Sequence, residues 1–167
     1  MIDYSLLLLF PAAMAFAAAM DMLTMTIPNR VSLLLVGAFF LAAYFAELPT
    51  QQILEHLGTG ALVLVICFAL FALGVFGGGD AKLLAASSLW IGFDQLLSYV
   101  LGISLAGAVL SIIVLYARRY FPEGSVNAPR WVLRLQARES GMPYGLAIAA
   151  AALWIYPNTA FFHGLAH

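Results

Sequence analysis

Residues 81–116 read AKLLAASSLWIGFDQLLSYVLGISLAGAVLSIIVLY, and this stretch decides how many helices the sequence predicts. It is almost wholly apolar and far longer than the roughly 20 residues that a helix needs to cross the hydrocarbon core of a membrane. Gly92-Phe93-Asp94 supplies a natural break, because glycine and a charged residue interrupt an apolar helix. We therefore expect a short helix over 81–91 and a full span over 96–117.

The composition of the whole chain indicates an integral α-helical membrane protein. The 167 residues are 64% hydrophobic and only 9% charged, whereas a soluble domain usually carries about 25% charged residues. The net charge of −1 gives no basic footprint for nucleic acid. Cys67 is the only cysteine, so neither an internal disulfide nor a cysteine zinc cluster is expected. The sequence predicts no metal and no cofactor.

The sequence predicts one transmembrane domain over 1–167, a bundle of about six helices. Ile27-Pro28 separates the first two spans, because a residue before proline avoids the helical conformation. A short interfacial helix is expected over 51–57, and a tail over 157–167. The aromatic residues Trp90, Tyr99, Trp154 and Tyr156 are interpreted as an interfacial belt. The predicted spans cover about 4–20, 29–46, 58–76, 81–91, 96–117 and 142–156.

In this six-span topology, the basic residues lie on one side of the membrane and the other side carries only acidic residues. The segments after spans one, three and five contain all seven Lys and Arg residues of the chain, five of them between Arg118 and Arg138. The opposite side holds Asp3, Glu47, Glu55 and Asp94. Positively charged loops remain in the cytoplasm. We therefore expect both termini outside and the basic loop 118–141 in the cytoplasm.

Asp21 and Asp80 fall on the same predicted cytoplasmic face, each at the end of a helix. An acidic residue at membrane depth costs about 2.5–3.5 kcal/mol on insertion scales, so it usually has a function. Two carboxylates close together can share one proton, and one then acts as a base on water while the other acts as an acid. The run Gly77-Gly78-Gly79 before Asp80 leaves room for an extended substrate backbone. The alternative is that Asp80 only caps its helix and Asp21 is an ordinary boundary residue.

Three segments together resemble the type IV prepilin peptidases, GxGD-type aspartyl proteases of bacterial inner membranes. The first is Asp21-x5-Ile27-Pro28-Asn29, and the second is Gly77-Gly78-Gly79-Asp80-Ala81-Lys82. The third is Met142-Pro143-Tyr144-Gly145, which is similar to the Pro-aromatic-Gly segment of that family.

The resemblance implies that Asp21 and Asp80 are the catalytic pair. It also implies a prepilin substrate, whose short basic leader is removed at the cytoplasmic face ahead of a hydrophobic helix. Larger members carry a cysteine-containing domain and N-methylate the new N-terminus. The lone Cys67 and the short chain favour cleavage without methylation, in the compact form typical of Flp (tight-adherence) pili. The archaeal preflagellin type is the alternative within this family.

Further residues of these segments are candidates for substrate binding or for support of the pair. Lys82 can bind a lipid phosphate, tune the aspartates or meet an acidic group of the substrate. Two other functions remain open at this stage: a proton-linked transporter that uses the aspartates as relay sites, and a non-catalytic subunit of pilus assembly. The candidate support residues are Gly77, Gly78, Gly79, Lys82, Pro28, Asn29, Pro143, Tyr144 and Gly145.

Overall fold

The computed structural model describes residues 4–120, 129–137 and 141–166, and their side chains except those of 4–7, 130, 136 and 164–166. Every regular element in these residues is a helix. The elements are α1 (Tyr4–Thr24), α2 (Asn29–Phe45), α3 (Thr50–Ala72), α4 (Gly78–Ile91), α5 (Leu96–Tyr120), α6 (Arg130–Gln136), α7 (Tyr144–Ile155), the 3₁₀ turn η1 (Tyr156–Asn158) and α8 (Ala160–Ala166).

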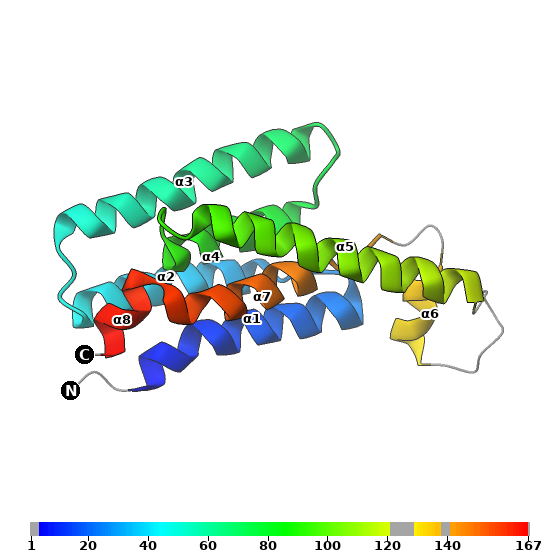
Figure 1. The fold of residues 1–167 in the computed structure, drawn as a ribbon, viewed down its shortest axis with the longest axis horizontal. Coiled ribbons are helices and arrows are strands. Elements are labelled where there is room, and N and C mark those ends of the chain that lie inside the picture. The colour runs from blue at the N-terminus through cyan, green and yellow to red at the C-terminus, as the bar shows by residue number, and fades with distance from the viewer. Residues whose placement is uncertain (1–3, 121–128, 138–140, 167) are drawn as a thin grey trace.

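The short helix α4 forms the centre of the bundle. It packs against α2, α3, α5 and α7, and α7 packs in turn on α1 and α5 (Figure 1). Its fourteen residues rise about 21 Å at 1.5 Å per residue. Most of its side chains from Leu83 to Ile91 are buried. The prediction of a short helix between the glycine run and Gly92 is confirmed. This short helix is surrounded by other helices of the bundle.

The two predicted breaks occur where the sequence places them. Met25 follows α1 in a left-handed conformation, with φ 55°, and Pro28 then caps the start of α2. Gly92 ends α4 with φ 76° and ψ 170°, a conformation that is practically restricted to glycine. The long apolar stretch therefore forms two helices.

Two predicted boundaries are wrong. The interfacial helix over 51–57 and the span over 58–76 are one continuous helix, α3, because Pro49 starts it and Gly58 and Gly60 remain helical within it. Gly74, with φ 72°, follows its end. The tail over 157–167 contains η1 and α8, and the ring of Phe161 is buried in the main core. Apolar burial therefore orders the end of the chain.

The predicted aromatic belt is also wrong for three of its four residues. Trp90, Tyr99 and Tyr156 are buried, whereas Trp154 is 81% exposed. Trp90 packs against Phe10, Phe39 and Phe161, and its indole N–H donates to the carbonyl of Leu35 at 3.0 Å. These four aromatic rings form the packed core at the end of the bundle where both chain ends lie (Figure 1).

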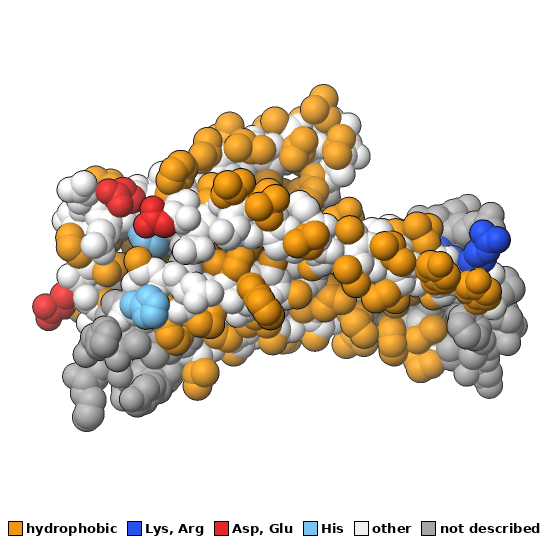
Figure 2. Space-filling model, in the orientation of Figure 1, with side chains coloured by type: hydrophobic (Ala, Val, Ile, Leu, Met, Phe, Trp, Pro, Cys, Tyr) orange, Lys and Arg blue, Asp and Glu red, His pale blue; other side chains and the backbone are white. Residues whose placement is uncertain are grey.

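The helices α3 and α5 are long and apolar enough to cross a membrane, judged by length and composition. Their 23 and 25 residues rise about 35 and 38 Å. Large apolar side chains cover much of the visible surface along the bundle (Figure 2). The remaining helices of the described chain are shorter or more buried, so helix length alone does not determine the number of transmembrane helices.

Candidate active site

Asp21 lies one turn before the end of α1, and its carboxylate meets the start of α7. The backbone N–H of Gly145 donates to Oδ2 of Asp21 at 2.7 Å, across 124 positions of sequence. The first N–H groups of a helix have no partner within the helix and carry partial positive charge. The buried carboxylate of Asp21 supplies that partner, so α7 and α1 fix each other at this point.

Position 145 has no room for a side chain. A Cβ there would lie 2.8 Å from Oδ2 and 3.1 Å from Cβ of Asp21, and 2.7 Å from Cδ1 of Ile27. The Cβ of Asp21 is one bond from the backbone of α1 and cannot move aside cheaply. Glycine is therefore required at this position for the start of α7 to approach the carboxylate.

Asp80 lies in the first turn of α4, where Gly77 is the N-cap residue. The alternative that Asp80 caps this helix is therefore wrong. A Cβ on Gly77 would lie 2.7 Å from Oδ2 of Asp80, which shows that the half-buried carboxylate folds back against Gly77. The absence of a side chain at position 77 thus permits the orientation of Asp80.

The two carboxyl groups interact electrostatically. Burial raises the pKa of Asp80 to about 7, and the negative charge of Asp21 contributes to the same shift. Burial also raises the pKa of Asp21, but the N–H groups of Gly145 and Leu146 oppose this by stabilising its charged form. Near neutral pH, Asp80 is therefore about half protonated and can donate a proton, while the hydrogen bonds to Asp21 favour its ionised form.

Ile27 separates the starts of α4 and α7. Its Cβ would lie 3.5 Å from a Cβ on Gly79, and its Cδ1 reaches the empty side of Gly145. The side chain also packs against the main core. Ile27 was predicted only as part of a helix break, and its positioning role was not. A large apolar residue directly before proline, at a helix break, was the available signal.

The glycine run has internal neighbours that the sequence did not predict. Gly77 faces Asp80, Gly78 would meet the ring of Phe71 at 3.2 Å, and Gly79 faces Ile27. The expectation was that these glycines leave room for a substrate backbone. Gly77 and Gly78 allow close contacts within the protein, whereas a Cβ on Gly79 would be in ordinary van der Waals contact with Ile27. The Gly77 backbone is also exposed, and the role of the run toward a substrate stays a prediction.

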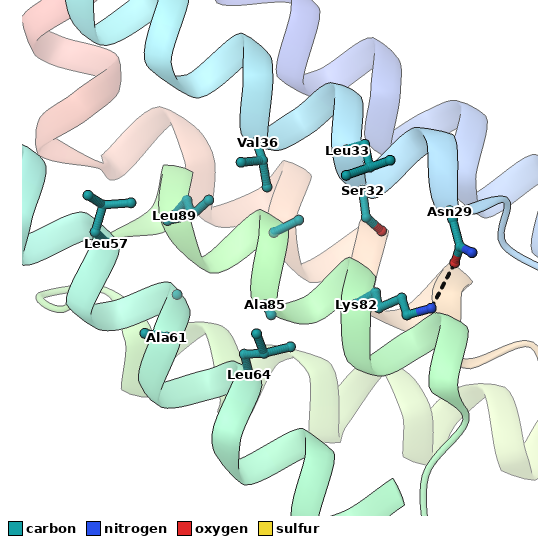
Figure 3. A pocket seen from close by; sticks show the side chains of 12 residues that line it. Asn29, Ser32, Leu33, Val36, Leu57, Ala61, Leu64, Lys82, Ala85 and Leu89 are labelled. Atoms are coloured by element: carbon teal, nitrogen blue, oxygen red, sulfur yellow. Dashed lines mark hydrogen bonds between the residues drawn. The ribbon is translucent and has the colours of Figure 1, made fainter.

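Asn29 and Lys82, both expected near the aspartates, bind one another. Nζ of Lys82 donates to Oδ1 of Asn29 at 3.0 Å, which ties the start of α2 to the first turns of α4 (Figure 3). Pro28 is the N-cap residue of α2, directly before Asn29. The contact spans 53 positions of sequence, and no local pattern pairs these two residues.

The third motif also reaches the site. Pro143 is the N-cap residue of α7. The ring of Tyr144 lies 6.3 Å from that of Phe76, the residue directly before the glycine run. The structure thus brings all three sequence motifs to one end of the bundle, with Asp21, Asp80 and Gly145 at their meeting point.

The chemistry available here is that of carboxyl groups and backbone N–H donors. Within the described part of the chain, no group of three or more His, Cys, Asp or Glu side chains is placed to hold a metal ion. Cys67 is buried on the α3 side of α4, against Val63, Ala81 and Ala85.

The comparisons with known proteins address the identity of this arrangement. No curated protein matches the chain significantly. No solved structure does so either. The model of the type IV leader peptidase family matches residues 8–112, which include both aspartates, Ile27 and the glycine run. Since this match covers more than half of the 167 residues, the chain belongs to the type IV leader peptidase family.

Proposed function

We propose that the protein is an aspartic endopeptidase that removes the basic leader from prepilins at the cytoplasmic face of the bacterial inner membrane. The observation that carries this proposal is that Asp21 and Asp80, from separate helices, come to one site, where Ile27 lies between Gly145, which binds Asp21, and Gly79, which precedes Asp80. Pilins of the Flp type are the proposed substrates, and cleavage without N-methylation is the proposed reaction. The supporting residues are Gly77, Gly78, Gly79, Pro28, Asn29, Lys82, Pro143, Tyr144 and Gly145.

In the proposed mechanism, the ionised Asp21 is the base and the protonated Asp80 is the acid. Gly145 holds Oδ2 of Asp21, so the other oxygen of that carboxylate can accept a proton from water. The water oxygen bonds to the scissile carbonyl carbon while Asp80 donates its proton to the carbonyl oxygen. As the tetrahedral intermediate collapses, the C–N bond breaks and the proton held by Asp21 passes to the leaving amine. The re-forming carbonyl returns its proton to Asp80.

This assignment predicts a decline in the cleavage rate on the alkaline side of neutrality. The acid must be protonated, and the pKa of Asp80 is about 7. Above that pH kcat/KM, which reports ionisation of the free enzyme, should decrease about tenfold per pH unit. Initial rates of leader cleavage from about pH 5 to about pH 9 check this, with each sample returned to neutral pH to exclude inactivation. A rate that stays constant up to about pH 9 would show that Asp80 is not the acid.

The proposed topology has six spans, formed by the apolar parts of α1, α2, α3, α4, α5 and α7, with both termini outside. The first and fourth spans cover about 4–20 and 81–91, so Asp21 and Asp80 lie just outside the membrane-spanning segments. Figure 2 supports it, since acidic side chains gather at the end of the bundle that carries the termini and basic side chains at the opposite end. Positively charged segments remain in the cytoplasm. The aspartates then lie at the cytoplasmic helix ends, within reach of water and of a leader peptide.

The direct test is cleavage of a prepilin by the purified protein. A prepilin with a basic leader is incubated with the protein in detergent, and the mass of the product locates the cut. Cleavage at the junction of the leader and the hydrophobic helix is expected, with an unmethylated new N-terminus. Substrate uptake into proteoliposomes without any cleavage would instead favour a transporter and overturn the proposal.

A groove between α3 and α5 is the proposed seat of the hydrophobic helix of the pilin. This α3–α5 groove has a volume of about 580 Å³, and Val63, Cys67 and Leu84 are among its lining residues. On α5 it extends from Leu96 to Ser111, a rise of about 22 Å. Phe76 and Tyr144 also line it, next to the glycine run and to Gly145. The groove thus connects the apolar flank of the bundle with the aspartates.

Filling the α3–α5 groove should slow cleavage of a substrate that carries the hydrophobic helix and leave cleavage of a substrate without it unchanged. Ala108→Trp is expected to slow cleavage of a full-length, membrane-embedded prepilin roughly tenfold, the effect of losing helix packing worth about 1–2 kcal/mol. Cleavage of a short soluble peptide across the same junction should not change. Ala69→Trp, at an exposed alanine of α3 outside the lining of this groove, is the matched control. Equal slowing of both substrates would show that the hydrophobic helix of the pilin does not bind in the α3–α5 groove.

A further inference from the structure

A second groove lies on the other flank of α3, between α3 and α2. This α2–α3 groove has a volume of about 550 Å³, and α4 forms its floor. Figure 3 shows apolar side chains from all three helices along it. They include Leu33, Val36, Leu57, Ala61, Leu64 and Leu89. Since α3 packs mainly on α4, an occupant of this groove would connect α3 to α2.

The groove is polar at one end only. Lys82, Asn29 and Ser32 line that end, and the rest of the lining is apolar. The ammonium group of Lys82 has three N–H donors, and one of them donates to Asn29, which directs the group to the mouth of the groove (Figure 3). Among the described residues, no carboxylate pairs with Lys82. An apolar channel with a positive charge at its mouth complements an anionic amphiphile.

The dimensions favour a lipid over a peptide helix. The lining extends from residue 29 to 36 on α2, from 57 to 64 on α3 and from 82 to 89 on α4. Each of these seven-residue steps rises about 10 Å. A peptide helix is about 10–12 Å wide and packs along its length, for which the α3–α5 groove offers about 22 Å and these steps only about 10 Å, whereas one leaflet of hydrocarbon is about 15 Å deep. The groove therefore accommodates the upper part of one acyl chain.

We infer that the α2–α3 groove binds an anionic phospholipid, with its phosphate on the ammonium group of Lys82 and one acyl chain between α2 and α3. The lipid would hold α3 in place beside α2. Since α3 leads into the glycine run and Asp80, this contact would also stabilise the first turn of α4. The inference does not depend on the proposed peptidase reaction.

The test measures lipid binding without any activity assay. The purified full-length protein in a neutral detergent receives phosphatidylglycerol or phosphatidylcholine, and native mass spectrometry counts bound lipids while thermal unfolding gives Tm. Phosphatidylglycerol should bind about fivefold more tightly, the factor that one basic residue near a membrane surface contributes. Lys82→Gln should remove this preference, and Lys82→Arg should retain it. Inorganic phosphate alone should not raise Tm, because the acyl chain contributes to binding.

Two matched variants decide whether the groove itself is the site. Ala61→Trp fills the groove and should weaken binding of both lipids, whereas Ala69→Trp, two turns away on the exposed side of α3, should not. Arg119→Gln removes an exposed basic residue at the end of α5 and should keep the preference for phosphatidylglycerol. The inference is wrong if Lys82→Gln keeps the preference, if Arg119→Gln loses it equally, or if Ala61→Trp binds lipid like the unaltered protein.

Discussion

Replacing either Asp21 or Asp80 by Asn should reduce leader cleavage by about a thousandfold or more, within the range of general acid–base catalysis and beyond it where two groups act as a unit. Asparagine keeps the shape of the side chain but can neither accept the proton of water nor donate an acidic proton. Rates of prepilin processing by each purified variant measure the effect. Asp94→Asn, at an exposed aspartate after α4, should cleave at the normal rate.

The stability of Asp80→Asn distinguishes a catalytic role from a structural one. The folded protein raises the pKa of Asp80 to about 7, so folding opposes its ionisation. The stability contributed by the protonated form is therefore fully present below the unfolded pKa of 3.8 and is lost as the pH rises from there to about 7. An uncharged Asn avoids that loss, so this variant should have an equal or higher Tm than the unaltered protein on the alkaline side. A large decrease in Tm together with the lost activity would indicate that Asp80 serves the fold.

Gly145→Ala is expected to slow cleavage roughly tenfold to hundredfold, because it disrupts a hydrogen bond to a charged group worth about 1.5–3 kcal/mol. The added Cβ would lie 2.8 Å from Oδ2 of Asp21, so the carboxylate or the start of α7 must shift. The N–H groups of Gly145 and Leu146 lower the pKa of Asp21, and their withdrawal should raise it. The acid limb of the pH–rate profile should therefore move to higher pH, which initial rates at several pH values measure.

Gly37→Ala is the matched control for this substitution. Gly37 lies within α2, and a Cβ there would meet no atom within 4 Å. Alanine in a helix interior is more stable than glycine by about 0.5–1 kcal/mol, so this variant should keep its activity and unfold at an equal or higher Tm. If Gly145→Ala cleaves with the normal rate and pH profile, the contact between Gly145 and Asp21 has no part in the reaction.

The local breaks of this chain are readable from the sequence because they depend on single residues. Proline at position 28 restricts the backbone, glycine at position 92 permits a conformation that other residues avoid, and both breaks occur as predicted. The segment 51–57 was misassigned because its polar residues suggested an interface, although the helix that Pro49 starts continues through Gly58 and Gly60. The tail was missed because its order comes from burial of Phe161, a contact with distant helices.

In the candidate site, too, the features set by single residues are readable from the sequence, and the contacts between distant helices are not. The sequence by itself determined the all-helical class, the presence of a short helix after the glycine run and the residue types that the site contains, because composition, helix breakers and motifs are local properties. Only the tertiary structure decided that Gly145 binds Asp21, that Lys82 binds Asn29 and that Ile27 separates two helix starts. The physical reason is that these helices are apolar on most sides, so their periodicity does not show which faces meet. The packing of side chains around α4 selects the faces, and it thereby brings two aspartates from separate helices into one electrostatically coupled pair.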